Sequence, residues 1–175
     1  MELPNLRLFI LGCLIWALPQ ISYAQQETPC QGGIYELVDP FMGNWKEYTV
    51  TVDGEVFIGD LRSSKSPDGC TIAQRFVSAD GSFSYQSFGY VEASSGLWKE
   101  VYVFSNGNNS EYQWLKEGED VLMRRTGGTR QLKYMHQLRL TNIGEKSYDV
   151  IEEHSYDKGQ TWEDIELTRI RKDKG

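Results

Sequence analysis

The chain contains only two histidines, His136 and His154, and a glutamate, Glu152, lies two residues before the second of them. Imidazole and carboxylate groups are the side chains that most often move protons, anchor polar ligands or bind metal ions. Residues two apart on a β-strand point to the same face. In the β-type run 147–156, Glu152 and His154 therefore share a face, which also carries Tyr148.

The preceding β-type run, 133–141, places His136 on the same face as Tyr134. This face is the more apolar of the two, so we expect it to point into the protein. A short turn between the two runs would bring His136 close to Glu152 and Tyr134 close to His154. The sequence thus predicts an internal His/Glu cluster carried by two adjacent strands.

Three interpretations of the His/Glu cluster stay open. It can be a buried polar network in which each group is paired and none reacts. It can anchor the polar end of a ligand in an aromatic pocket. It can also form a metal or haem ligand set, although its spacing matches no recognised motif. We expect no catalytic residue, no cofactor and no metal site.

Aromatic residues are the other candidates for a binding site. Tyr112 and Trp114 alternate on the run 110–116, so they share a face. Aromatic side chains usually fill a small barrel, and where they line a cavity they favour an apolar or aromatic ligand. The candidate ligand-binding residues are His136, Glu152, His154, Tyr134, Tyr148, Tyr112 and Trp114.

About ten short β-type runs must position these residues. They lie near 41–52, 55–63, 70–77, 82–91, 97–104, 110–116, 120–126, 133–141, 147–156 and 162–171. Asp-Gly and Asn-Gly pairs between them tolerate the positive φ angles of tight hairpins. Short hairpins make sequential strands antiparallel neighbours, and such a twisted sheet tends to close. The sequence predicts an all-β, antiparallel up-and-down barrel of about eight to ten strands, with a sandwich as the alternative.

Two ends of this pattern resemble a known signature. Gly43-Asn44-Trp45 in the first run and Arg169 in the last are similar to the calycin signature of lipocalins and fatty-acid-binding proteins. That resemblance implies that Trp45 packs under Arg169 and closes one end of the barrel. A wider set of motifs resembles an exported bacterial family of lipocalin-like barrels of unknown function: Phe41-Met42-Gly43-Asn44-Trp45, Phe88-Gly89-Tyr90, Gly96-Leu97-Trp98 and Thr168-Arg169. The resemblance implies a fold and a compartment but no known activity.

The segment Ser155-Tyr156-Asp157-Lys158-Gly159-Gln160-Thr161-Trp162 resembles the Asp box of sialidases. That motif is a stabilised hairpin, in which the aspartate caps the turn and the tryptophan packs beneath it. A sialidase would need several such boxes and a chain more than twice as long. We therefore interpret Asp157 and Trp162 as structural residues of the last hairpin.

The first 24 residues are typical of a signal peptide. Arg7 precedes an apolar run, and Ser22-Tyr23-Ala24 offers small residues for cleavage near Ala24. We expect residues 25–39 to form an extended lead-in with a short helical turn, and residues 40–172 to form the barrel domain. The protein would then be exported, either periplasmic or secreted, with no transmembrane segment.

The chain has three cysteines, Cys13, Cys30 and Cys70. Cys13 falls inside the leader, where lipidation is an alternative to cleavage. Cys30 and Cys70 remain as an even pair, which predicts a disulfide in an oxidising compartment. Closing that loop would stabilise the fold by about 4 kcal/mol.

The formal net charge is −7, and the leader contributes none of it because Glu2 and Arg7 cancel. An acidic domain repels phosphate backbones, so nucleic acid is not an expected partner. The leading hypothesis is an exported barrel that binds a small apolar or aromatic molecule in its interior. The alternatives are an enzyme that uses the His/Glu cluster, and a filled structural or interaction barrel.

Overall fold

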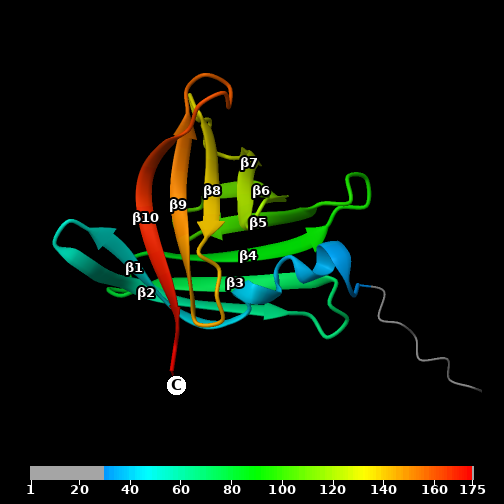
Figure 1. Cartoon of the computed structure of the whole chain (residues 1–175), viewed down its shortest axis with the longest axis horizontal. Coiled ribbons are helices and arrows are strands. Elements are labelled where there is room, and N and C mark those ends of the chain that lie inside the picture. The colour runs from blue at the N-terminus through cyan, green and yellow to red at the C-terminus, as the bar shows by residue number, and fades with distance from the viewer. Residues whose placement is uncertain (1–29, 175) are drawn as a thin grey trace, which may run out of the picture.

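Ten antiparallel strands follow two 3-10 turns in the computed structural model, which describes residues 30–174 (Figure 1). The elements are η1 (Gly33–Glu36), η2 (Asp39–Phe41), β1 (Gly43–Thr51), β2 (Gly54–Lys65), β3 (Thr71–Ser78), β4 (Ser84–Val91), β5 (Trp98–Phe104), β6 (Asn109–Glu117), β7 (Asp120–Gly128), β8 (Met135–Thr141), β9 (Ser147–Ser155) and β10 (Glu163–Lys172). Each strand pairs with the next, and β1 also pairs with β10. The sheet is therefore a closed up-and-down barrel, which confirms the fold predicted from the sequence.

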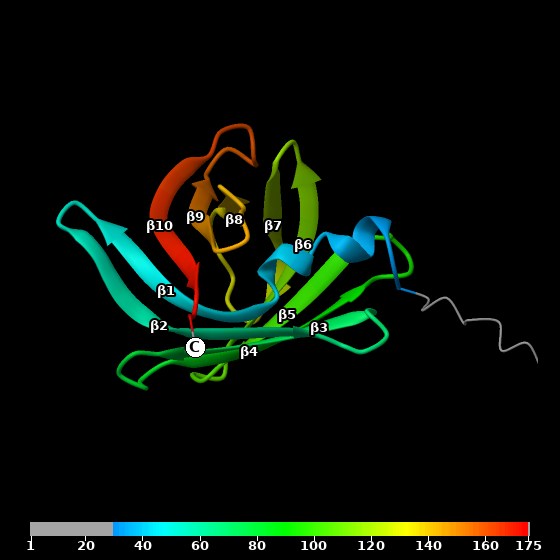
Figure 2. The same cartoon turned by 60° about the horizontal axis from the view of Figure 1, so that its bottom comes forward.

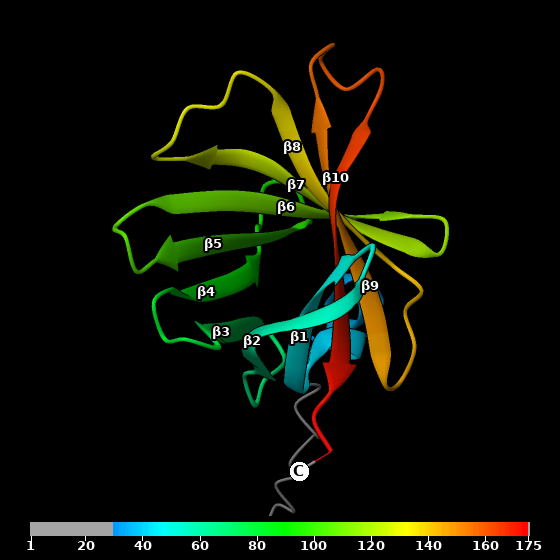
Figure 3. The same cartoon turned by 90° about the vertical axis from the view of Figure 1, so that its left-hand side faces the viewer.

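The strands cross one another steeply around the barrel. In Figure 1, β8, β9 and β10 run across the direction of β2 to β5, and Figure 3 shows the strands fanning out from that crossing. Tight turns connect them, such as the one after β6, where Gly118 has a φ of 61°. This left-handed conformation favours glycine. No helix among the described residues is long and apolar enough to cross a membrane.

The segment before β1 closes one end of the barrel, at the opening seen in Figure 2. Val38 and Phe41 are buried in the core. The Trp45 indole N–H donates to the Phe41 carbonyl oxygen (3.0 Å), and the Trp98 indole N–H donates to that of Ile34 (2.7 Å). The helical turn expected here is present, but Phe41 ends η2 and does not begin the first strand. We call residues 33–41 the plug.

A disulfide between Cys30 and Cys70 ties the chain just before the plug to the turn before β3, as the sequence predicted. Lys65 adds a second tie, because its ammonium group donates to the Asp39 carboxylate (2.6 Å) and to the Tyr35 carbonyl oxygen (2.7 Å). The plug is therefore held to the barrel covalently and by an ion pair. The expected signal peptide, its cleavage site and Cys13 lie outside the described residues.

The cation that covers Trp45 is Lys172, whose Nζ lies 5.3 Å from the centre of the indole ring. The Arg169 expected in this place points outward, because its neighbours Thr168 and Ile170 line the interior and side chains alternate along β10. Arg169 instead pairs with Asp149, with 2.8 Å between Nε and Oδ1. Trp45 is buried as expected, but Arg169 forms its ion pair on the outer surface of the barrel.

Candidate functional site

The His/Glu cluster forms on the inner face of β8 and β9. Its three members, His136, Glu152 and His154, are the only group of metal-ligating side chains found together among residues 30–174. Nε2 of His136 lies 3.2 Å from Oε1 of Glu152, and Nε2 of His154 lies 2.9 Å from the same oxygen. Both imidazoles are nearly buried, with 11% and 10% of their side chains exposed. Two rings thus converge on one carboxylate oxygen.

The strand register explains how the cluster forms. His136 pairs directly with His154 across β8 and β9, and Glu152 pairs with Leu138. Glu152 is two residues from His154 on β9, so all three side chains share the inner face. The expected contact of His136 with Glu152 is therefore present. The strand register differs by two residues from the expected one, because His136 lies directly opposite His154 and not opposite Glu152.

Two tyrosines complete the surroundings of the cluster. The Tyr112 hydroxyl lies 3.3 Å from Nδ1 of His136, the ring nitrogen that faces away from Glu152. The ring of Tyr134 stacks on that of His154, with 3.9 Å between centroids. Tyr134 precedes β8, which begins at Met135, so a loop residue and not a strand residue makes this contact. Both imidazole planes are fixed by aromatic neighbours.

The two histidines hold the pKa of Glu152 below its usual range. The hydrogen bond from His136 is the largest cause, partial burial opposes it, and the hydrogen bond from His154 adds to the lowering. The carboxyl group is 35% exposed on its side chain, so water reaches it. Glu152 is therefore a carboxylate at neutral pH.

Two members of the cluster, His136 and Glu152, face a cavity of about 250 Å³, which we call the outer cavity. His136, Glu152, Tyr134 and Tyr112 line it, together with Arg125. Its rim is formed by the β5–β6 turn and the β7–β8 loop, at the end of the barrel opposite the plug. Nε of Arg125 is buried without a hydrogen-bond partner among the described residues.

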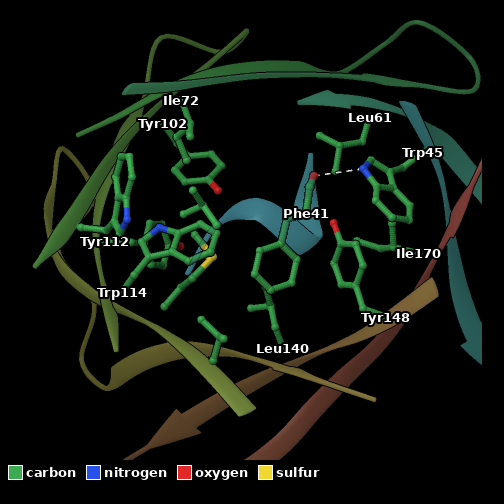
Figure 4. Close-up of a cluster of buried hydrophobic side chains, with 14 of the residues drawn as sticks. Phe41, Trp45, Leu61, Ile72, Tyr102, Tyr112, Trp114, Leu140, Tyr148 and Ile170 are labelled. Carbon is green, nitrogen blue, oxygen red and sulfur yellow. Dashed lines mark hydrogen bonds between the residues drawn. The ribbon is translucent and has the colours of Figure 1, made fainter. Parts of the chain in front are cut away.

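A second cavity of about 220 Å³, the inner cavity, lies between the outer cavity and the plug. Tyr112, Trp114 and Tyr148 line it. Phe41 of the plug packs on the rings of Trp114 and Tyr148, and Figure 4 shows these side chains together in the core. Tyr112 and Phe104 line both cavities. The sequence-predicted residues are thus split: Trp114 and Tyr148 line the inner cavity, His136, Glu152 and Tyr134 line the outer one, and Tyr112 lines both. His154 lines neither and lies behind Glu152, with which it pairs.

Two acidic residues that the sequence reasoning missed lie in the same interior. Glu47 on β1 lines the inner cavity and is 8% exposed. No hydrogen bond or ion pair reaches its carboxyl group from the described part of the chain, and burial alone raises its pKa to about 8. At neutral pH Glu47 is mostly protonated, so it presents both a hydrogen-bond donor and an acceptor to the cavity.

Glu100 on β5 is fully buried, and burial raises its pKa to about 7. Unlike Glu47, it has partners. The hydroxyl of Ser87 donates to Oε1, and the indole N–H of Trp114 donates to Oε2 at 3.0 Å. Tyr102 also hydrogen-bonds to it. Glu100 therefore holds together three strands beneath the aromatic wall of the inner cavity.

The alternation of side chains along the strands would have predicted that both Glu47 and Glu100 point into the barrel. Glu47 is two residues after the buried Trp45, and Glu100 lies between the buried Trp98 and Tyr102. Each shares the face of its aromatic neighbours. An acidic residue within an alternating aromatic series is buried with them, whatever its own polarity.

The last hairpin is organised by Asp157. Its carboxylate accepts hydrogen bonds from the hydroxyl of Ser155 (2.8 Å) and from the hydroxyl and backbone N–H of Thr161 (2.6 and 2.9 Å). These bonds lower the Asp157 pKa to about 2. Trp162 lies under the guanidinium of Arg124, at 5.5 Å, on the outside of the barrel. Both residues stabilise a turn, and neither lines the inner or the outer cavity.

The fold and the cavities define a closed ten-stranded antiparallel barrel with an aromatic interior, compatible with a lipocalin-like fold. No protein-family model matches the chain, and a search of curated proteins finds no match.

Proposed function

We propose that this protein is an exported lipocalin-like barrel that binds a small apolar or aromatic molecule in its inner cavity. The observation that carries this proposal is the cavity itself, whose walls are mainly aromatic and aliphatic. An apolar cavity of roughly 150 Å³ in a protein core admits benzene. A cavity of about 220 Å³ therefore has room for a one-ring or two-ring molecule.

Glu47 supplies the specificity in this proposal. Its protonated carboxyl group is buried, unpaired within the described residues and placed on the cavity wall. A buried polar group without a partner costs free energy, which a ligand recovers by hydrogen bonding to it. The preferred ligand thus combines an apolar body with one hydroxyl, carbonyl or amine group.

Export is supported by the leader pattern of residues 1–24 and by the disulfide between Cys30 and Cys70, since such bonds persist in oxidising compartments. The resemblance to an exported bacterial barrel family agrees with this placement. A mature protein purified from the periplasm or medium should begin near Gln25 and carry the bridge. A retained leader or free thiols would contradict export.

The ligand is tested with 2-naphthol, a two-ring molecule with one hydroxyl, by calorimetry and by quenching of tryptophan fluorescence, since Trp114 lines the cavity. Leu140→Trp places a large ring in the cavity, and we expect it to weaken binding at least tenfold. The matched control is Val103→Trp on the outer face of β5, where Val103 is 56% exposed. Overpacking costs roughly 1–3 kcal/mol, so thermal unfolding is followed for both variants.

Equal affinity in Leu140→Trp and Val103→Trp would place the probe outside the inner cavity. An absence of binding, together with a bare mass in native mass spectrometry of the exported protein, would overturn the proposal in favour of a filled barrel.

A further inference from the structure

We infer that His136, Glu152 and His154 form a binding site for one divalent transition-metal ion, of the class of Zn²⁺, Co²⁺ or Fe²⁺, with open coordination positions toward the outer cavity. This site is separate from the inner cavity and does not depend on the ligand proposed there. Two imidazoles and one carboxylate are a ligand set that such ions accept in proteins.

The spacing of the donor atoms fits an ion. Metal–nitrogen and metal–oxygen bonds of about 2.0–2.2 Å around a tetrahedral centre place neighbouring donors about 3.4 Å apart. Nε2 of His136 and Nε2 of His154 lie 3.2 and 2.9 Å from Oε1 of Glu152, and all three donor atoms lie within 4.8 Å of one another. An ion therefore needs only small side-chain rotations to reach all three.

The supporting contacts also fit. A histidine that binds metal through one nitrogen usually hydrogen-bonds through the other. His136 meets this expectation, because its Nδ1 lies 3.3 Å from the Tyr112 hydroxyl. The ring of His154 is held instead by stacking with Tyr134. The three ligands also stand on paired strands, which hold them more firmly than loops do.

The position of the site leaves the ion accessible. Three protein ligands leave at least one position for water or an exogenous ligand. Glu152 and His136 line the outer cavity of about 250 Å³, and Arg125 lines it too, with a buried Nε that lacks a partner among residues 30–174. An open coordination position would therefore face a cavity that water and small solutes can enter.

The competing interpretation is a closed hydrogen-bond network, and it assigns the protons differently. In the network, Nε2 of each histidine carries a proton toward Glu152, and Nδ1 of His136 accepts from Tyr112. With an ion bound, Nε2 of His136 coordinates it, and Nδ1 carries the proton and donates to the Tyr112 oxygen. The tautomer of His136 thus separates the two states.

The experiment uses the mature protein, residues 25–175, without a histidine tag, because the chain's two histidines are then the only imidazoles in solution. Chelator-treated protein is titrated with Co²⁺ and then Zn²⁺. We expect visible absorption that saturates at one Co²⁺ per chain and disappears as Zn²⁺ displaces it. His136→Gln, Glu152→Gln and His154→Gln should each weaken binding at least 100-fold. The control is Glu117→Gln, which removes the same charge at an exposed position near the plug. This variant should bind Co²⁺ as tightly as the wild type does.

A second measurement does not depend on variants that fold. In ¹⁵N spectra of the unmodified protein, Zn²⁺ should shift both imidazole signals and convert His136 to the tautomer with hydrogen on Nδ1. Imidazole signals that do not shift when Zn²⁺ is added would overturn the metal site. So would a Co²⁺ affinity that is unchanged in all three ligand variants, and either result would leave the closed hydrogen-bond network as the interpretation.

Discussion

The pKa values of acidic side chains are shifted in opposite directions at the two ends of the barrel interior. Near the plug, burial raises the pKa of Glu47 to about 8 and that of Glu100 to about 7. At the other end, hydrogen bonds from His136 and His154 hold the pKa of Glu152 below its usual range. All three carboxyl groups lie on inward-facing strand positions, so the sheet alone does not decide their charge.

The difference comes from partners and water. Glu47 has neither a cation nor a hydrogen-bond donor in the described structure, and Glu100 has only neutral donors. Glu152 has two imidazoles and is partly exposed. Desolvation favours the neutral acid at the plug end, whereas charged or polar partners favour the carboxylate at the open end. The plug end is thus suited to an uncharged guest and the open end to a cation.

Replacing Glu100 with alanine should lower the free energy of unfolding more than any other substitution proposed here. The change leaves the donors of Ser87, Tyr102 and Trp114 without their acceptor and opens a cavity in the core. Unsatisfied buried donors and a cavity together predict a loss of roughly 4 kcal/mol in the free energy of unfolding, measured by urea denaturation. Glu117→Ala, at an exposed turn, should change stability by less than about 0.5 kcal/mol. A loss of similar size in both variants would show that Glu100 is not a structural centre.

How much of this was predictable differs between the two ends. The ten strands followed from alternation and turn residues, and the contacts of His136 with Glu152 followed from their shared face. The short helical turn of the plug was expected too, but its burial in the barrel end was not, because the burial of Phe41 depends on long-range contacts with Trp114 and Tyr148. The outward direction of Arg169 depends on the register at which the barrel closes, and register is set by the whole sheet.

The next largest change in the free energy of unfolding is expected for Glu47→Gln, which should stabilise the protein above acidic pH. The pKa of Glu47 is raised in the folded protein, so between about pH 4.5 and 8 the unfolded chain releases this proton while the folded protein keeps it. The stability of the wild type therefore falls as pH rises through this window. Glutamine has no such proton, so the variant should match wild type near pH 4 and exceed it near pH 8 by about 4 kcal/mol.

Urea denaturation of the Glu47→Gln variant and wild type across this pH range measures the effect. Parallel stability curves for the two proteins would show that Glu47 ionises freely in the folded state, which requires water in the inner cavity and weakens the case for an apolar guest. Glu100 contributes a similar but smaller slope to both proteins, so only the difference between them reports on Glu47.

Glu152→Gln should have the smallest effect on stability, measured with a chelator present so that no ion contributes. Its contacts with His136 and His154 are short, but about a third of the side chain is exposed and solvent screens the interaction. We expect a loss of less than about 1 kcal/mol, far below that of Glu100→Ala. A loss as large as that of Glu100→Ala would mean that the His/Glu cluster exists to hold β8 and β9 together. A small loss would mean that the two nearly buried imidazoles around this carboxylate are not needed to hold β8 and β9 together, as expected of a binding site.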